Sequence, residues 1–298
     1  MRENFTSPAY PLVTVGIPAF NSEKTISAAI QSVLQQDYEN LELIVSDNFS
    51  TDTTLEICEG FKRNDPRVTV IAQSNNIGAV NNFNFLLERA NGTYFCWLGS
   101  DDRFAPEHIG LSVALLQKES DLIGCMARAI FDYEVSTDIK PATYHFGSSP
   151  IQRIRNFFRN PGRSHGLFYG LYKVENLRTY RFLSREFFAW DWCLILHLLA
   201  QGKIGSTERL GLISGSRGVS SSNLVYQHYG ISGFKRLLPY SKFTKVTWSN
   251  RQVWSKGARV YLLYWLIRIN IRYLLLERFE VKHWIKTRIS IFLSGDSK

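Results

Sequence analysis

Two adjacent carboxylates, Asp101 and Asp102, stand where a strongly apolar run of the sequence stops. That run, residues 94–98, is rich in aromatic side chains and ends at Gly99, which predicts a strand buried on both faces. Neighbouring carboxylates repel each other unless a cation or hydrogen-bond donors compensate their charge. Because hard oxygen ligands suit Mg²⁺ or Mn²⁺, the pair predicts a divalent-cation site. The alternative is a polar turn in which one Asp caps the following helix.

A third acid, Asp191, is the candidate for a general base. It is the only acid between Phe187 and Ala200, where the sequence predicts an apolar helix, and a Trp stands on either side of it. Apolar surroundings raise the pKa of a carboxyl group and favour proton uptake from a hydroxyl nucleophile. The alternative is that Asp191 is the N-cap of the helix, a position that Asp favours.

The elements that would position these acids alternate between strand and helix. Strands are predicted for residues 12–17, 41–45, 68–72, 94–98 and 122–126, and helices for residues 22–34, 51–62, 79–89 and 106–118. Such alternation predicts a parallel sheet with right-handed crossovers, in which ligands bind beyond the carboxyl ends of the strands. The polar residues that follow these strands include Asn21, Asp47, Asn75, Asn76, Asp101 and Asp102.

The connection after the first strand, Pro18-Ala19-Phe20-Asn21, argues against two common ways of binding a nucleotide. It lacks the Gly-rich fingerprint of dinucleotide-binding folds, and the sequence contains no P-loop motif. A His-Glu-x-x-His motif and cysteine spacings typical of zinc sites are also absent. A nucleotide in this crevice would therefore need a divalent cation to neutralise its diphosphate.

The order of these motifs resembles that of the family-two glycosyltransferases with the GT-A fold, over residues 13–221. The matching stretches are Val-Thr-Val-Gly-Ile-Pro-Ala-Phe-Asn (13–21), Leu-Ile-Val-Ser-Asp-Asn-Phe-Ser-Thr-Asp (43–52), Asn-Ile-Gly followed by Asn-Asn (76–82), and Trp-Leu-Gly-Ser-Asp-Asp with a later Pro (97–106). The resemblance implies an α/β, Rossmann-like, mostly parallel sheet flanked by helices. It also implies a hexosyltransferase that moves a sugar from a nucleotide-sugar donor to a hydroxyl of a glycan or lipid-linked saccharide, with inversion, in polysaccharide or cell-envelope biosynthesis.

The resemblance further implies roles for single residues. Asp47 would contact the nucleotide base, Asp102 would ligate Mn²⁺ or Mg²⁺, and Asp101 would lie near the metal or the ribose. Asp191 would be the base. The nucleotide-sugar pocket would be completed by Pro18, Phe20, Asn21, Asn76, Gly78, Asn82 and Arg217. Arg217 lies in a Ser/Gly loop that could close over a diphosphate, since guanidinium groups suit phosphate oxygens, and the alternative is a solvated surface Arg.

Two departures from the family pattern leave two alternative functions open. Many members carry an acid at the position of Gly99, and the family usually has an acid at the position of Trp190. One alternative is therefore a non-catalytic sugar-nucleotide-binding protein. Another is a sugar-phosphate nucleotidyltransferase, although such an enzyme would normally carry a Gly-rich loop with Arg or Lys after its first strand.

Positive charge gathers in the last quarter of the sequence. From Ile231 to the end there are 14 Lys and Arg against 3 Asp and Glu, whereas the rest is close to neutral. Residues 260–279 predict an amphipathic, aromatic and basic helix, which suits an anionic membrane surface. The alternative is a terminal helix packed on the main domain with its basic side chains reaching into water. A nucleic-acid partner is disfavoured because no reader motif is present.

The composition changes near residue 226, and the resemblance implies a glycosyltransferase domain over residues 1–225, followed by a basic aromatic helical extension, residues 226–298. Within the domain, the nucleotide-binding half covers about residues 10–126 and the acceptor half about residues 127–225.

Four scattered cysteines predict buried free thiols, which suit a reducing compartment. No signal core starts the sequence, and no uncharged apolar run approaches the roughly 18 residues of a spanning helix. We therefore expect a cytoplasmic protein, peripheral on the inner face of the membrane.

Overall fold

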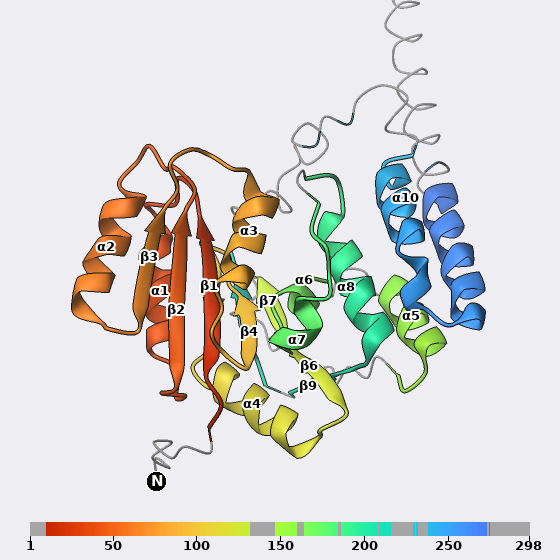
Figure 1. The fold of residues 1–298 in the computed structure, drawn as a ribbon, viewed down its shortest axis with the longest axis horizontal. Coiled ribbons are helices and arrows are strands. Elements are labelled where there is room, and N and C mark those ends of the chain that lie inside the picture. The colour runs from red at the N-terminus through yellow and green to blue at the C-terminus, as the bar shows by residue number, and fades with distance from the viewer. Residues whose placement is uncertain are drawn as a thin grey trace, which may run out of the picture.

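The computed structural model of the chain describes residues 10–131, 147–159, 164–183, 186–207, 209–215, 229, 231, 238–272 and 274. Its first part alternates strand and helix, as the sequence predicts (Figure 1). The elements are β1 (Val13–Ala19), α1 (Ile26–Leu34), β2 (Leu41–Asp47), α2 (Thr54–Asn64), β3 (Val68–Ala72), α3 (Ala79–Glu88), β4 (Tyr94–Trp97), β5 (Arg103–Phe104), α4 (His108–Lys118), β6 (Leu122–Met126) and β7 (Ala129–Phe131).

Among the described residues, seven strands form one mixed sheet in the order β3-β2-β1-β4-β8-β6-β9. Here β8 is Leu171–Lys173 and β9 is Lys203–Ser206. The pairs among β3, β2, β1 and β4 are parallel, and β6 pairs with β9 in parallel, while β8 enters antiparallel to both β4 and β6. The expected α/β fold with a mostly parallel sheet flanked by helices is therefore confirmed.

The sheet is covered by helices on both faces, which explains why its central strands are apolar throughout. On one face, Val15 and Ile17 of β1 belong to the same buried cluster as Ile30 of α1. On the other face, Phe95 of β4 and Leu86 of α3 are fully buried together. Strands buried on both faces carry near-continuous apolar runs, and this pattern made them visible in the sequence.

Two boundaries near β1 differ from the prediction. The strand does not stop before Pro18 but continues through it, with Pro18 opposite Ser46 of β2. The pairing of β1 with β4 ends at Gly16, so the missing N–H of Pro18 forfeits no bond to β4. The following helix begins at Ile26 with Thr25 as its N-cap, rather than at Asn21 or Ser22.

A smaller sheet of the described residues carries the order β5-β10-β7, where β10 is Leu212–Ser214. β10 runs antiparallel to β5 and parallel to β7. β5 directly follows the Asp101-Asp102 turn in the sequence, so this pairing brings the end of β10 back to the two acids. The partners of β10 lie far from it in the sequence, so local signals could not indicate this pairing.

The remaining helices lie toward the β8-β6-β9 half of the sheet, and residues of α6, α7 and α8 belong to one buried cluster with β4 (Figure 1). They are α5 (Pro150–Arg159), α6 (Ser164–Phe168), α7 (Val174–Leu177), α8 (Trp190–Gln201), α10 (Ser241–Ser249) and a helix over residues 256–272. Leu262 and Leu266 of that last helix are fully buried in one cluster with Phe243 of α10 and Leu194 of α8. The described part of the basic extension thus packs on the main domain, the second of the two alternatives drawn from the sequence.

Two smaller expectations concern the whole chain. The four cysteines are free and buried, as predicted. Over the part of the chain that the structure describes, none of the helices has both the length and the apolar character needed to cross a bilayer.

Candidate active site

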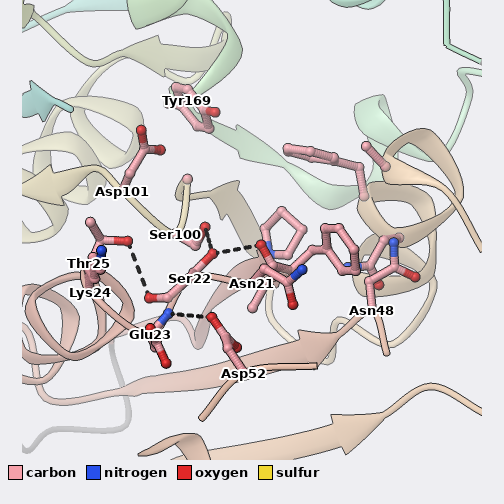
Figure 2. A pocket seen from close by; sticks show the side chains of 17 residues that line it. Asn21, Ser22, Glu23, Lys24, Thr25, Asn48, Asp52, Ser100, Asp101 and Tyr169 are labelled. Carbon is pink, nitrogen blue, oxygen red and sulfur yellow. Dashed lines mark hydrogen bonds between the residues drawn. The ribbon is translucent and has the colours of Figure 1, made fainter. Parts of the chain in front are cut away.

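A cavity of about 620 Å³ opens beyond the carboxyl ends of β1, β2 and β4 (Figure 2). Its wall contains the continuous segment from Pro18 to Thr25, together with Asn48, Asp52, Ala79, Asn82, Phe83, Gly99, Ser100, Asp101 and Tyr169. The structure thus brings together five of the residues predicted for the nucleotide-sugar pocket: Pro18, Phe20, Asn21, Asn82 and Asp101. The crevice lies where parallel α/β sheets bind their ligands.

The loops after β1 and β2 are fastened to each other, which gives the cavity a defined wall. Asn21, which has a positive φ of 47°, accepts a hydrogen bond from the Thr51 N–H at 2.9 Å. Asn tolerates this left-handed conformation better than most residues. Asp52 accepts bonds from the N–H groups of Glu23 at 3.2 Å and Thr54 at 3.0 Å, so it joins the β1 loop to the start of α2.

A hydroxyl pair connects the β1 loop to the turn after β4. The Oγ atoms of Ser22 and Ser100 lie 2.8 Å apart, and Figure 2 shows this pair with Asp101 and Tyr169 at one end of the cavity and Asn48 at the other. A nucleotide that extends from Asn48 to Asp101 would therefore pass this hydroxyl pair and lie against a wall of mixed polar and apolar residues.

Asp47 ends β2 and lies behind this wall rather than in it. Its side chain is 2% exposed, and its Oδ2 accepts a bond from the Ser50 N–H at 3.0 Å. Its Oδ1 is buried and has no hydrogen-bond partner among the described residues. A buried carboxylate oxygen without a donor is costly, so it suits a site that a ligand N–H completes.

Asn76 and Gly78 act on the cavity indirectly. Asn76 Oδ1 accepts bonds from Asn48 Nδ2 at 3.1 Å and from the Gly78 N–H at 2.9 Å, which ties the loop after β3 to the cavity residue Asn48. Gly78 has a φ of +82° and is the N-cap of α3, whose residue Ala79 lines the cavity. Neither of these two predicted residues is part of the cavity wall.

Asp102 is held in one orientation by β10 and the residue after it. Its side chain is 3% exposed, and its Oδ1 accepts bonds from Ser214 Oγ and from the Gly215 N–H, both at 2.9 Å. His165 Nε2 lies 2.6 Å from Ser214 Oγ and 3.8 Å from Asp102 Oδ2. Since the Ser214 hydroxyl carries one proton and gives it to Asp102, the close contact with His165 is satisfied by a proton on Nε2.

The surroundings of Gly99, one of the two departures from the family pattern, leave little room for a side chain. A Cβ atom at this position would lie 2.5 Å from Asp102 Oδ2 and 3.2 Å from the Tyr169 hydroxyl. Asp102 therefore occupies the space that a side chain at position 99 would need. An acid at position 99 would therefore require Asp102 to move.

Tyr169 is the residue that sequence reasoning missed. Burial raises the pKa of its phenol well above the usual value, and the negative charges of Asp102, Asp101 and Asp191 raise it further. The charges of three acids from two distant parts of the sequence thus act on one phenol, which stays protonated and can donate a hydrogen bond. Tyr169 stands in an apolar stretch of the sequence with no motif around it.

Asp191 lies in the first turn of α8, and the N-cap of this helix is Ala189, which has a φ of 62°. The N-cap alternative for Asp191 is therefore wrong. Burial raises the pKa of Asp191 to about 6, and the nearby His165 partly opposes this shift. Trp190 packs against Phe83 of α3 at 5.5 Å between ring centroids, so the residue that replaces the family's first acid fixes the start of α8. A carboxylate with this pKa can accept a proton near neutral pH.

The acids at positions 101 and 102 fit a divalent cation that is shared with a ligand. Among the described residues, no group of three or more His, Cys, Asp and Glu side chains could hold a metal ion. Mg²⁺ sites commonly use one or two carboxylates and take their other ligands from substrate phosphates and water. Asp101, which lines the cavity, and Oδ2 of the neighbouring Asp102 match this chemistry. Arg217, the predicted contact to the diphosphate, lies outside the described residues.

We expect replacement of Gly215 by Ala to destabilise the protein by about 1–3 kcal/mol, because the new methyl group would collide with the carbonyl oxygen of Asp101. The change also displaces the N–H that holds Asp102. Urea unfolding of the variant measures the effect. Gly257→Ala is the matched control, since a Cβ there has no neighbour within 4 Å. Equal stability of both variants would contradict the close packing of β10 on the acidic turn.

The sequence from residue 14 to residue 176 matches the model of the family described as Glycosyl transferase family 2. The chain belongs to this family. The match covers more than half of the chain and includes β1 to β4, β6, β8 and the acidic turn. The resemblance seen in the sequence motifs is confirmed, and membership in a family of glycosyltransferases favours this enzyme class over a nucleotidyltransferase.

Known proteins similar to this family member act on or bind nucleotide sugars. The chain is 35% identical over 108 residues to the Escherichia coli UDP-Glc:alpha-D-GlcNAc-diphosphoundecaprenol beta-1,3-glucosyltransferase WfaP, an alignment that covers 36% of the chain and 42% of WfaP. Its fold is similar to that of S. aureus TarS 1–349 in complex with UDP-GlcNAc, with a TM-score of 0.66, 16% identity, and coverage of 85% of this chain and 70% of TarS.

A second solved structure is similar over nearly the whole chain. It is the mannosyltransferase PcManGT from Pyrobaculum calidifontis in complex with GDP-Man and Mn²⁺, with a TM-score of 0.56, 16% identity, and coverage of 96% of this chain and 81% of that one. At such identities the structural similarity concerns the fold alone. The chain aligns with only 30% to 44% of the length of the first three curated relatives, so the similarity to them is confined to part of each protein.

Proposed function

We propose that the protein transfers a sugar from a nucleoside-diphosphate sugar to a hydroxyl group of a glycan or lipid-linked saccharide, with inversion at the anomeric carbon. The observation that carries this proposal is that Asp101 and Tyr169 line the cavity and that the charges of Asp101, Asp102 and Asp191 all act on the Tyr169 phenol. A donor bound along the cavity wall would put its diphosphate at Asp101 and Asp102. Its sugar would then face Asp191.

The nucleotide end of the donor would use groups that the fold already leaves available. The unpaired Oδ1 of Asp47 would accept an N–H of the base, and the Asn21–Asp52 wall would hold the nucleoside. Asp102 and Asp101 would hold Mn²⁺ or Mg²⁺, which supplies charge stabilisation for the departing diphosphate. The bonds from Ser214 and Gly215 keep Asp102 oriented before the donor arrives.

Asp191 would act as the general base. Its carboxylate would take the proton of the acceptor hydroxyl as the oxygen forms a bond to the anomeric carbon. The bond between that carbon and the phosphate oxygen breaks on the opposite face, and the nucleoside diphosphate leaves. The Tyr169 phenol, kept protonated by its surroundings, would donate a hydrogen bond beside the reacting groups.

The chemistry suits a role in polysaccharide or cell-envelope biosynthesis at the cytoplasmic face of a membrane. WfaP is named for transfer to a diphosphoundecaprenol-linked sugar, and an acceptor of that kind resides in a bilayer. The basic extension offers a means of peripheral attachment, since the sequence from residue 238 to residue 272 carries several Lys and Arg and no acid.

A thermal-shift panel tests the donor site. UDP, UDP-glucose, UDP-N-acetylglucosamine and GDP-mannose are each added with and without Mn²⁺. A ligand at about 100 times its dissociation constant should add about 2.7 kcal/mol of stability, and the shift should require the metal and disappear in Asp102→Asn. Release of nucleoside diphosphate in the presence of an acceptor then separates an enzyme from a non-catalytic sugar-nucleotide-binding protein. Absence of any shift would overturn the donor site.

A further inference from the structure

A second cavity, of about 530 Å³, lies between α5 and the helix of residues 256–272. Four arginines line it, one pair from each helix. Arg155 and Arg159 stand one turn apart on α5, and Arg268 and Arg272 stand one turn apart on the other helix. The rest of its wall is almost entirely aromatic. This cavity shares no wall residue with the proposed donor cavity.

Within the described part of the chain, none of the four guanidinium groups forms an ion pair with a carboxylate, and α5 and residues 238–272 contain no Asp or Glu. Arg153 on α5 shows the contrast. It is buried and donates to the carbonyl oxygens of Leu199 at 2.6 Å and Ser148 at 2.7 Å, so its role is structural. The cavity therefore holds concentrated positive charge suited to phosphate oxygens.

Aromatic side chains in the cavity wall join the two helices and restrict the position of Arg268. Phe158 and Trp265 stack with ring centroids 5.5 Å apart and an angle of 5° between their planes, which joins the two helices. Arg268 lies over the Trp265 ring at 5.1 Å from its centroid and donates to the Tyr264 hydroxyl at 2.6 Å. An arginine fixed in this way loses less conformational freedom when it binds an anion.

An exposed apolar stripe runs along the helix of residues 256–272 next to the arginines. Val260, Ile267 and Ile271 are 71%, 50% and 50% exposed, and Tyr264 between them is 48% exposed. Their spacing of three and four residues places them on one face. Because Leu262 and Leu266 anchor the opposite face in the core, the stripe points away from the protein. Figure 1 shows the C-terminal helices at the end of the molecule far from β3.

We propose that this cavity binds the phosphate-bearing head group of a membrane lipid, while the apolar stripe rests in the acyl boundary of the bilayer. A phosphate head joined to an apolar tail matches an arginine-rich cavity beside an exposed apolar face. Trp192, which follows Asp191 in the first turn of α8, lies in the wall of the cavity. Lipid binding would thus hold this turn at the membrane surface. The proposal does not depend on sugar transfer.

Co-sedimentation of the full chain with vesicles tests this site. The native protein should bind vesicles of phosphatidylcholine mixed with phosphatidylglycerol, and bind vesicles of phosphatidylcholine alone much more weakly. The double variant Arg155→Gln/Arg268→Gln should lower the apparent affinity for the anionic vesicles about 10- to 30-fold. Its fold is checked by thermal unfolding and by its response to UDP with Mn²⁺. An unchanged response to UDP separates failure of the lipid site from failure of the proposed donor site.

The control variant is Lys245→Gln/Lys256→Gln, which removes the same amount of charge from residues 238–272 outside the cavity. Its affinity should fall less than threefold. Equal losses in the two double variants would overturn the site and indicate attraction by net charge alone. Failure of the native protein to bind anionic vesicles would overturn the proposed site as well. The lipid site would also be overturned if the native protein bound inorganic diphosphate through these arginines but did not bind vesicles. Its ligand would then be a free anion.

Discussion

Asp191→Asn is expected to lower the rate of sugar transfer by about 10²- to 10⁴-fold, the usual contribution of a general base. The Asn side chain keeps the size of Asp but cannot take the proton of the acceptor hydroxyl. Binding of the nucleotide should not change, because Asp191 is not part of the donor-cavity wall. Initial rates of nucleoside diphosphate release with an acceptor, together with donor affinity, measure both effects.

The pH dependence of the native enzyme gives an independent test of the same group. Burial raises the pKa of Asp191 to about 6, and only its deprotonated form can act as a base. kcat/KM should therefore rise with pH up to about 6 and then level off, since it reports the free enzyme. Asp191→Asn should lose this rise.

The stability of the protein and its activity should respond in opposite directions, both to rising pH and to the change Asp191→Asn. The folded pKa of Asp191, about 6, is above its ordinary value of 3.8, so the folded state binds the proton more tightly. The stability linked to this proton is fully present below the unfolded pKa and is lost as pH rises through about 6. At pH 8 the neutral Asn should make the protein more stable by about 1–3 kcal/mol.

Asp121→Asn is the control, because Asp121 is 57% exposed and pairs with Lys203 on the surface. It should alter neither transfer nor stability appreciably. A variant at position 191 that transfers sugar at the native rate would show that the base is another group. The protein would then need a different proton acceptor near Tyr169.

The sequence predicted the part of the fold in which local signals and tertiary packing agree. β3 and β6 have the predicted bounds, because each is a short apolar run between polar or turn-forming residues. β8 was not predicted as a separate strand. It has three residues, and its antiparallel place between β4 and β6 depends on partners far away in the sequence. Such a short segment carries no periodicity of its own.

The candidate site shows the same division between local and distant contacts. Asp101 and Asp102 were recognisable because they follow the end of an apolar run, and Asp191 because it is the only acid within one. Ser214, which holds Asp102, is 112 positions further along the chain. No local pattern indicates that the two would meet, since β10 pairs with β5 only in the folded protein. Tyr169 reaches the acids in the same way, through the insertion of β8 into the sheet.

Gly99→Asp should weaken the protein's use of the metal, although it creates the acid that many family members carry. A Cβ atom at position 99 would lie 2.5 Å from Asp102 Oδ2, a distance that real Cβ atoms do not adopt. Asp102 would have to move and lose its bonds from Ser214 and Gly215. Loss of groups that orient a metal ligand typically lowers metal affinity 10- to 100-fold. We therefore expect the Mn²⁺ concentration for half-maximal activity to rise by that factor.

Gly99→Ala separates the two contributions to this effect, since it adds the Cβ atom without the charge. Both variants should be impaired, and the Asp variant more, because its carboxylate also repels Asp102. Gly60→Asp is the control for adding an acid, because the nearest atom to a Cβ at position 60 is Arg63 Nη2 at 3.8 Å. If Gly99→Asp instead used Mn²⁺ at lower concentrations than the native protein, Asp102 would not be the metal ligand that Ser214 and Gly215 hold in place. The family's additional acid would then be one that this cavity can accept.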